Sequence, residues 1–178
     1  KNLEVSGLVE DAYNTIKGQA ATDKFEVAIN GNDVTITIVD RTMNSVNALA
    51  GTGIATAAEE LLETAGVKEV KISIPGTDIA VVVTAENLRT SLAELDALFI
   101  QLAGGNATAT AGDLAGKELS IEIFLEEGYT AVGSTEFTVN FGVKEVKVDG
   151  LVEDAYNTIK GQAATDKFEV AINGNDVT

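Results

Sequence analysis

The chain lacks the two side chains on which most catalytic and metal-binding chemistry depends, because it contains no Cys and no His. Their absence excludes thiol nucleophiles, disulfides, Ser–His and Cys–His pairs and the usual zinc sites. No G-x-S-x-G motif marks a nucleophilic serine. Adjacent carboxylates such as Glu59 and Glu60 do not share one face of a helix, so they indicate solvated charge rather than an acid–base pair. The sequence therefore predicts a protein that is not an enzyme.

Trp is also absent, Pro75 is the single proline, and aromatic residues make up only 5% of the chain. Hydrophobic residues still reach 45%, a content that argues against disorder. A chain of 178 residues is long enough to bury a core. We expect that core to be built from small and β-branched side chains.

Basic residues are scarce, with 12 Lys and Arg against 28 Asp and Glu and a formal net charge of −16. Such a surface repels phosphate backbones and anionic lipid, so we expect neither nucleic acid nor a membrane surface as a partner. No apolar run approaches the ~20 residues that a membrane-spanning helix needs. Cations and basic partners are compatible with this charge.

A long exact repeat is the main feature of the sequence. Residues 7–35 recur without a single change as residues 150–178, an offset of 143. The preceding residues are related but not identical, since Leu3 becomes Val146 while Val5 is kept as Val148. We therefore interpret 1–149 as one full repeat unit and 150–178 as the start of the next.

Two origins explain this repeat. One is a tandem array of which the chain represents one unit and part of a second. The other is an engineered chain to which a copy of the first segment was appended as a complementing piece. The divergence of residues 144–149 from residues 1–6 favours the array, because an appended copy gives no reason to vary the residues before it.

Hydrophobic periodicity predicts an α+β fold in which antiparallel β-hairpins pack on amphipathic helices. The predicted helices cover 8–19, 41–50, 54–65 and 86–103, and the predicted strands cover 25–29, 34–39, 67–74, 78–83, 119–123 and 137–141. Residues 106–116 are predicted to form a loop of small residues. The similarity of 29–34 to 74–79 suggests an internal helix-plus-hairpin repeat, for which 118–148 offers a third strand pair.

The terminal copy is predicted to hold a helix and one complete strand, over residues 168–172, whose partner strand has only begun by Thr178. We expect that this copy cannot close its own hairpin, and an unpaired strand edge favours pairing with another sheet. Self-association of identical repeats through this edge is the resulting hypothesis. The candidate assembly residues are Phe168, Val170 and Ile172, with their counterparts Phe25, Val27 and Ile29.

Two further kinds of site have weaker sequence signals. Oxygen-bearing side chains at predicted turns are weak calcium candidates, although a hairpin turn explains them without a metal. These residues are Asn30, Asn32, Asp33 and Asp78. The EF-hand spacing is absent, and no other cofactor is predicted. Asn106 begins the sequon Asn-Ala-Thr and is a candidate glycosylation site.

Domain-sized, acidic repeats without Cys, here joined through residues 148–151, resemble the repeat regions of large prokaryotic cell-surface proteins. That class includes adhesin stalks, S-layer proteins and extracellular filaments. The resemblance implies an extracellular or cell-surface location and a structural role. Repeats of that class are usually all-β and immunoglobulin-like, and the helical patterns of this chain depart from them.

These observations lead to one functional expectation and two alternatives. We expect an extracellular structural repeat that forms a filament, stalk or surface layer by head-to-tail linkage and strand pairing. The first alternative is an acidic adhesive module, with calcium as a candidate cofactor, in which the repeats provide avidity. The second is the engineered chain described above.

Overall fold

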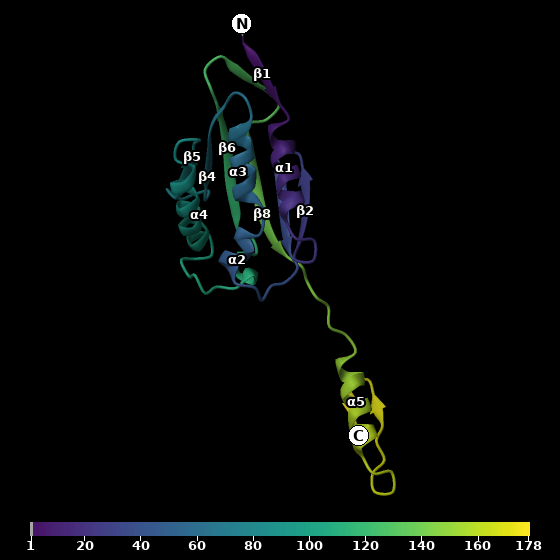
Figure 1. Ribbon diagram of the computed structural model, residues 1–178. Helices are drawn as coiled ribbons and strands as arrows, with labels where there is room; N and C mark the ends of the chain where they lie inside the picture. The colour runs from purple at the N-terminus through teal and green to yellow at the C-terminus, as the bar shows by residue number, and fades with distance from the viewer. Residues whose placement is uncertain (1) are drawn as a thin grey trace. The chain divides into compact units, whose positions relative to one another are not determined.

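A computed structural model describes residues 2–178, which form two compact units. The first unit ends at Lys144, and the second comprises Glu145–Thr178. The fold class predicted from the sequence is confirmed, because the first unit is an α+β fold of helices packed on a sheet. Each unit is described by itself below (Figure 1).

The first unit is built around a mixed six-stranded sheet with the order β2-β3-β8-β6-β4-β5. Its strands are β2 (Phe25–Asn30), β3 (Asp33–Ile38), β4 (Val67–Ser73), β5 (Ala80–Val83), β6 (Glu118–Leu125) and β8 (Glu136–Val143). Both predicted hairpins, β2–β3 and β4–β5, are present and antiparallel. The central pair β6–β8 is antiparallel, whereas β3 and β8 run parallel.

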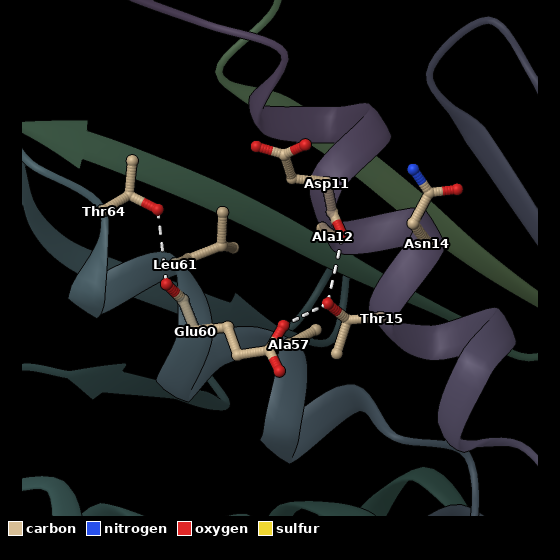
Figure 2. Close-up of a pocket in the computed structure, with 8 residues that line it drawn as sticks. All are labelled: Asp11, Ala12, Asn14, Thr15, Ala57, Glu60, Leu61 and Thr64. Carbon is tan, nitrogen blue, oxygen red and sulfur yellow. Dashed lines mark hydrogen bonds between the residues drawn. The ribbon is translucent and has the colours of Figure 1, made fainter.

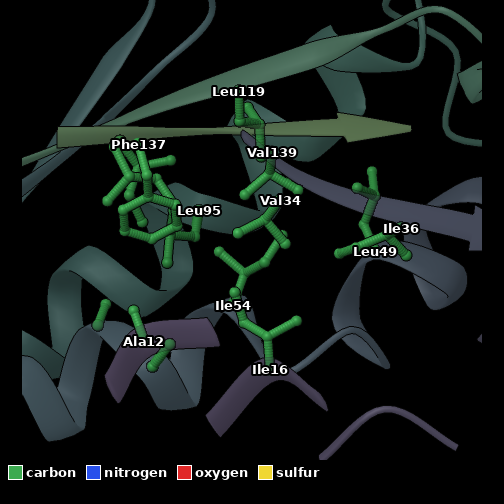
Figure 3. Packing of buried hydrophobic residues seen from close by; sticks show 14 of the residues in the cluster. Ala12, Ile16, Val34, Ile36, Leu49, Ile54, Leu95, Leu119, Phe137 and Val139 are labelled. Carbon is green, nitrogen blue, oxygen red and sulfur yellow. The ribbon is translucent and has the colours of Figure 1, made fainter. Parts of the chain in front are cut away.

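The helices cover one face of this sheet (Figure 1). They are α1 (Leu8–Gln19), α2 (Ser45–Ala50), α3 (Ile54–Glu63) and α4 (Leu88–Leu102), with a short 3₁₀ helix η1 (Ala111–Leu114). Period-two alternation places aliphatic and Phe side chains of the strands under the helices, while Thr, Ser, Asn and Glu occupy the open face. The core thus lies in a single layer between helices and sheet (Figure 3).

The helix boundaries follow capping chemistry. Asn44 is the N-cap of α2, and its side-chain oxygen accepts hydrogen bonds from the backbone N–H groups of Val46 and Asn47. The predicted helix over 41–50 is therefore too long at its start, because Asn44 ends the preceding loop. After α4, Gly104 and Gly105 have positive φ, a conformation that ends a helix and that glycine adopts readily. The predicted loop 106–116 contains η1.

Two features of the first unit were not predicted. A small parallel sheet joins β1 (Leu3–Ser6) to β7 (Tyr129–Val132), which lie more than 120 residues apart in the sequence. The two helix–hairpin blocks also use their strands differently. In the first block the second strand, β3, faces the middle of the sheet, whereas in the second block the first strand, β4, does so. Similar local sequences thus occupy different positions in the sheet.

Candidate assembly site

The second unit repeats the local structure of the first helix. The helix α5 (Leu151–Gln162) has the bounds of α1 shifted by 143 residues. Each helix begins after a left-handed glycine, with φ of 70° at Gly7 and 69° at Gly150. In each helix a lysine lies over a tyrosine ring one turn before it, with Lys160 5.5 Å from the ring centroid of Tyr156. The local sequence alone is therefore compatible with this helix in two different surroundings.

The prediction that the second unit cannot close a hairpin is wrong. Its strands β9 (Ile172–Asn173) and β10 (Asp176–Val177) pair with each other around a turn at Gly174. Ala171 and Thr178 extend the ladder through two backbone hydrogen bonds of 2.9 and 2.8 Å. The prediction considered only the missing length of the second strand. The Asn-Gly-Asn-Asp turn closes locally and needs few paired residues on each side.

The remainder of the predicted strand over 168–172 is not a strand in the structure. Phe168 and Val170 lie before β9 and have no ladder partners. In the first unit their counterparts Phe25 and Val27 pair within residues 36–38 of β3. The segment 150–178 contains no counterparts of those three residues. Of the candidate assembly residues in the second unit, only Ile172 is therefore paired.

Identical side chains have opposite exposures in the two units. The exposed fraction is 2% at Leu8 but 64% at Leu151, 0% at Ile16 but 49% at Ile159, and 4% at Phe25 but 63% at Phe168. No residue of α5 is buried. Because exposed apolar groups that lie together mark interaction sites, this surface is the candidate functional site. Phe168 was among the assembly residues predicted from the sequence, but the face of α5 was not. The exact repeat implies that face, because a copy of α1 must copy the side chains that α1 buries.

The first unit shows what that face contacts when it is covered. The helix α1 lies against α3 and the sheet, and its buried side chains belong to the main core. Figure 3 shows Ile16, Ile54 and Val34 lying one behind another between α1 and the sheet. The approach of the helices is close, because a Cβ on Gly53 would lie 2.6 Å from the Cβ of Gln19. Contacts this specific depend on the shape of both partners.

A surface groove of about 280 Å³ runs between α1 and α3 (Figure 2). The hydroxyl of Thr15 donates to the Glu60 carboxylate across it, and the hydroxyl of Thr64 donates to the Glu60 carbonyl oxygen at 3.3 Å. The rest of its lining consists of Asp11, Ala12, Asn14, Ala57 and Leu61. The bond between Thr15 and Glu60 links the two helices, and the second unit contains α5 but no copy of α3.

The calcium candidates are divided between two turns. Asn30, Asn32 and Asp33 belong to the β2–β3 hairpin, and Asp78 belongs to the loop between β4 and β5. The Asp33 carboxylate accepts a hydrogen bond of 2.6 Å from the hydroxyl of Thr138. Within residues 2–178, no three acidic side chains lie together in a way that could hold a metal ion. The geometry therefore does not assemble these four residues into one site.

Asp40, at the end of the β2–β3 block, has a local role. The hydroxyl of Thr42 donates to the Asp40 carboxylate at 2.7 Å and its backbone N–H donates at 3.0 Å. These two bonds stabilise the ionised carboxylate and lower the pKa of Asp40 below its ordinary value of 3.8. The shift therefore reflects a turn rather than a reactive centre.

The candidate glycosylation site lies in an exposed loop. The side-chain oxygen of Asn106 accepts hydrogen bonds from the backbone N–H of Thr108 at 2.9 Å and from its hydroxyl at 2.7 Å. Both hydrogen bonds are exposed, so the loop places the sequon at the surface of the first unit. None of the helices within residues 2–178 has the length and apolar character that would let it cross a membrane.

No protein-family model matches this chain, and comparisons with curated proteins and with solved structures find no match either. The functional argument therefore depends on the exact repeat and on the geometry of the two units.

Proposed function

We propose that the chain is part of an extracellular structural protein in which identical units follow one another head to tail as a filament, stalk or surface layer. The observation that carries the proposal is the second unit, which reproduces α1 and the turn of the first hairpin but lacks the remainder of a fold. Its exposed apolar face is the face that the first unit buries in its core. A further unit that supplied that remainder would cover it.

The path of the chain through the first unit supports a linear arrangement. The helix α1 ends beside Phe25, which pairs with Ile38, and Ile38 pairs with Val143 at the end of β8. The start of α1 therefore lies at the opposite end of the unit from Val143. Figure 1 shows the N-terminal strand β1 at one end of this unit and β8 leaving it at the other. A chain that enters at one end and leaves at the other produces a string when its units are repeated.

The end of β8 is fixed before the next unit begins. The backbone N–H of Lys144 donates to the Ile38 carbonyl at 2.9 Å, and its side chain forms an ion pair of 2.7 Å with Glu26. Residues 145–149 then contain no strand or helix. A short connection of this kind joins successive units while keeping them close in sequence. The chemistry absent from the sequence, with neither Cys nor His, favours this structural role over catalysis.

The proposal is tested by extending the chain so that residues 36–143 follow Thr178. The added residues supply what the copy lacks, so we expect a second complete unit and burial of α5. Small-angle X-ray scattering should show a maximum dimension larger by about one unit length, and the heat of unfolding should rise to roughly twice its original value, because unfolding enthalpy scales with the number of residues.

The matched control carries the same added residues in scrambled order. It has the same mass and charge but cannot complete the fold, so it should gain disordered chain without added unfolding heat. A correctly ordered extension that also fails to gain unfolding heat would contradict the proposed unit. One that folds but leaves the maximum dimension unchanged would contradict the linear arrangement.

A further inference from the structure

We propose that residues 150–178 of one molecule occupy, in a second copy of the chain, the place that residues 7–35 fill in the first unit. Separate chains would then be joined by exchange of identical helix-and-hairpin segments. The inference rests on the proposed function in one respect, because it takes the repeated segment to be the beginning of a unit. It goes further in naming a noncovalent joint and its partner, a second copy of this chain.

Residues 150–178, the donor, fit their place in the second copy, the acceptor, because they are identical to the segment that they replace. Every side chain that residues 7–35 place in the core is present at the same spacing in residues 150–178. The donor also holds the local conformation that docking requires, since α5 has the bounds of α1 and the pair Ile172–Val177 reproduces Ile29–Val34. Docking therefore requires no conformation of the helix or the turn that the segment does not already adopt.

The donor lacks what the acceptor supplies. Phe168 and Val170 have no ladder partners in the second unit, and residues 36–38 form the ladder with their counterparts in the first unit. Every copy of the chain contains residues 36–38. The sheet of the acceptor also offers β8 beside β3, where Val34 pairs with Val139 and is fully buried. Val177, the counterpart of Val34, is 40% exposed in the second unit and would be covered there.

The connection also favours a second copy over the same molecule. To fill its own first unit, Gly150 would have to reach the start of α1 from Lys144, and these two points lie at opposite ends of the unit. Six residue steps span at most roughly 20 Å, and a 12-residue helix such as α1 is itself about 18 Å long. The connection would have to be fully extended along the whole helix. A second copy places no such demand on residues 145–149.

The N-terminal segment of the acceptor molecule, residues 7–35, controls the exchange. Residues 7–35 and 150–178 make the same contacts, so replacing one by the other changes the free energy little, as in other exchanges of identical elements. Residues 7–35 of the acceptor, which are covalently attached to it, therefore occupy this position under ordinary conditions. Weakening that segment alone should shift the equilibrium toward the donor of another molecule.

The experiment uses the full chain with Ile16→Asp, with the matched change Ile159→Asp, and with both. Ile16 is fully buried, so a carboxylate in its place opposes docking of the N-terminal segment while leaving 150–178 unchanged. We expect the Ile16→Asp variant to form dimers and larger oligomers by light scattering after gel filtration. Its melting temperature should rise with protein concentration, because association stabilises the folded state.

The two other variants give the comparison. Ile159→Asp carries the same charge change on an exposed residue and should remain a monomer with the original melting temperature. The double variant has no competent segment, so it should be monomeric and melt roughly 10 °C or more below the original chain. The difference between Ile16→Asp and the double variant measures rescue by residues 150–178.

Two results would overturn the inference. If Ile16→Asp and the double variant melt alike, the C-terminal segment does not enter the vacated place. If Ile16→Asp is rescued but stays monomeric at all concentrations, the segment fills its own molecule and the joint between copies is wrong. The extension experiment under Proposed function is independent of both, because its second unit is completed covalently.

Discussion

At the scale of single residues, the contact between Gly66 and Tyr129 fixes the start of β4. Gly66 has a φ of 93°, and a Cβ built on it would overlap the Tyr129 ring. Its carbonyl accepts a 2.7 Å hydrogen bond from the backbone N–H of Glu126. The ring of Tyr129 thus covers the turn before β4. Tyr129 is also the first residue of β7, which pairs with β1. Three distant parts of the first unit depend on a residue without a side chain.

We predict that Gly66→Ala lowers the free energy of unfolding by roughly 3 kcal/mol or more. About 1–2 kcal/mol would come from the left-handed backbone, and the remainder from displacement of the Tyr129 ring. The control is Gly76→Ala, because Gly76 has a φ of 76° but no heavy atom within 4 Å of the added Cβ. It should show the backbone cost alone. The free energy of unfolding is measured by urea denaturation, and equal decreases for the two variants would contradict the role given to Tyr129.

At the scale of elements, α1 and α5 separate the effect of sequence from the effect of packing. Their 12 residues are identical, yet α1 is covered by α3 and the sheet whereas α5 has no buried residue. An isolated helix of this length is only marginally stable in water, because few hydrogen bonds offset the cost of nucleation. Most of the stability of α1 must therefore come from its contacts.

We expect this difference to appear in amide hydrogen exchange. The central amides of α1 should open only with the whole first unit, whereas those of α5 should exchange faster by several orders of magnitude. Exchange should be followed by NMR, since peptides from the two copies have the same mass. The adjacent helix α3 provides an internal reference for the first unit. Comparable protection in α1 and α5 would show that α5 is covered in solution.

The elements also show how far sequence reasoning reaches. Local periodicity predicted a helix over 86–103 and a strand over 34–39, and the structure has α4 and β3 at these places. The strand β1 was not predicted, because its parallel partner β7 lies far away in the sequence and local periodicity carries no information about such pairs. Local turn chemistry also formed the hairpin β9–β10 where a count of residues predicted none. The apolar face of α5 follows from the exact repeat of α1 and not from local periodicity alone.

At the scale of the whole molecule, charge opposes the apolar burial that holds the first unit together. The formal net charge is −16, and the ion pairs among residues 2–178 are Lys71–Glu122 at 3.9 Å and Lys144–Glu26 at 2.7 Å. Both pairs are substantially exposed, so each contributes little to stability. Repulsion among carboxylates therefore outweighs attraction, and its effect is greatest at low ionic strength, where the screening length is about 30 Å.

We therefore predict that added salt stabilises the protein. The melting temperature should rise by roughly a few degrees between about 10 mM and 500 mM NaCl, because screening weakens net repulsion more than it weakens two exposed ion pairs. A fall in melting temperature over this range would show that attractive charge pairs dominate.

Calcium and magnesium chloride at equal concentration provide the matched control, since they screen alike. A much larger rise with calcium would reveal a specific site and support the adhesive alternative. Equal rises would attribute the effect to the acidic surface as a whole.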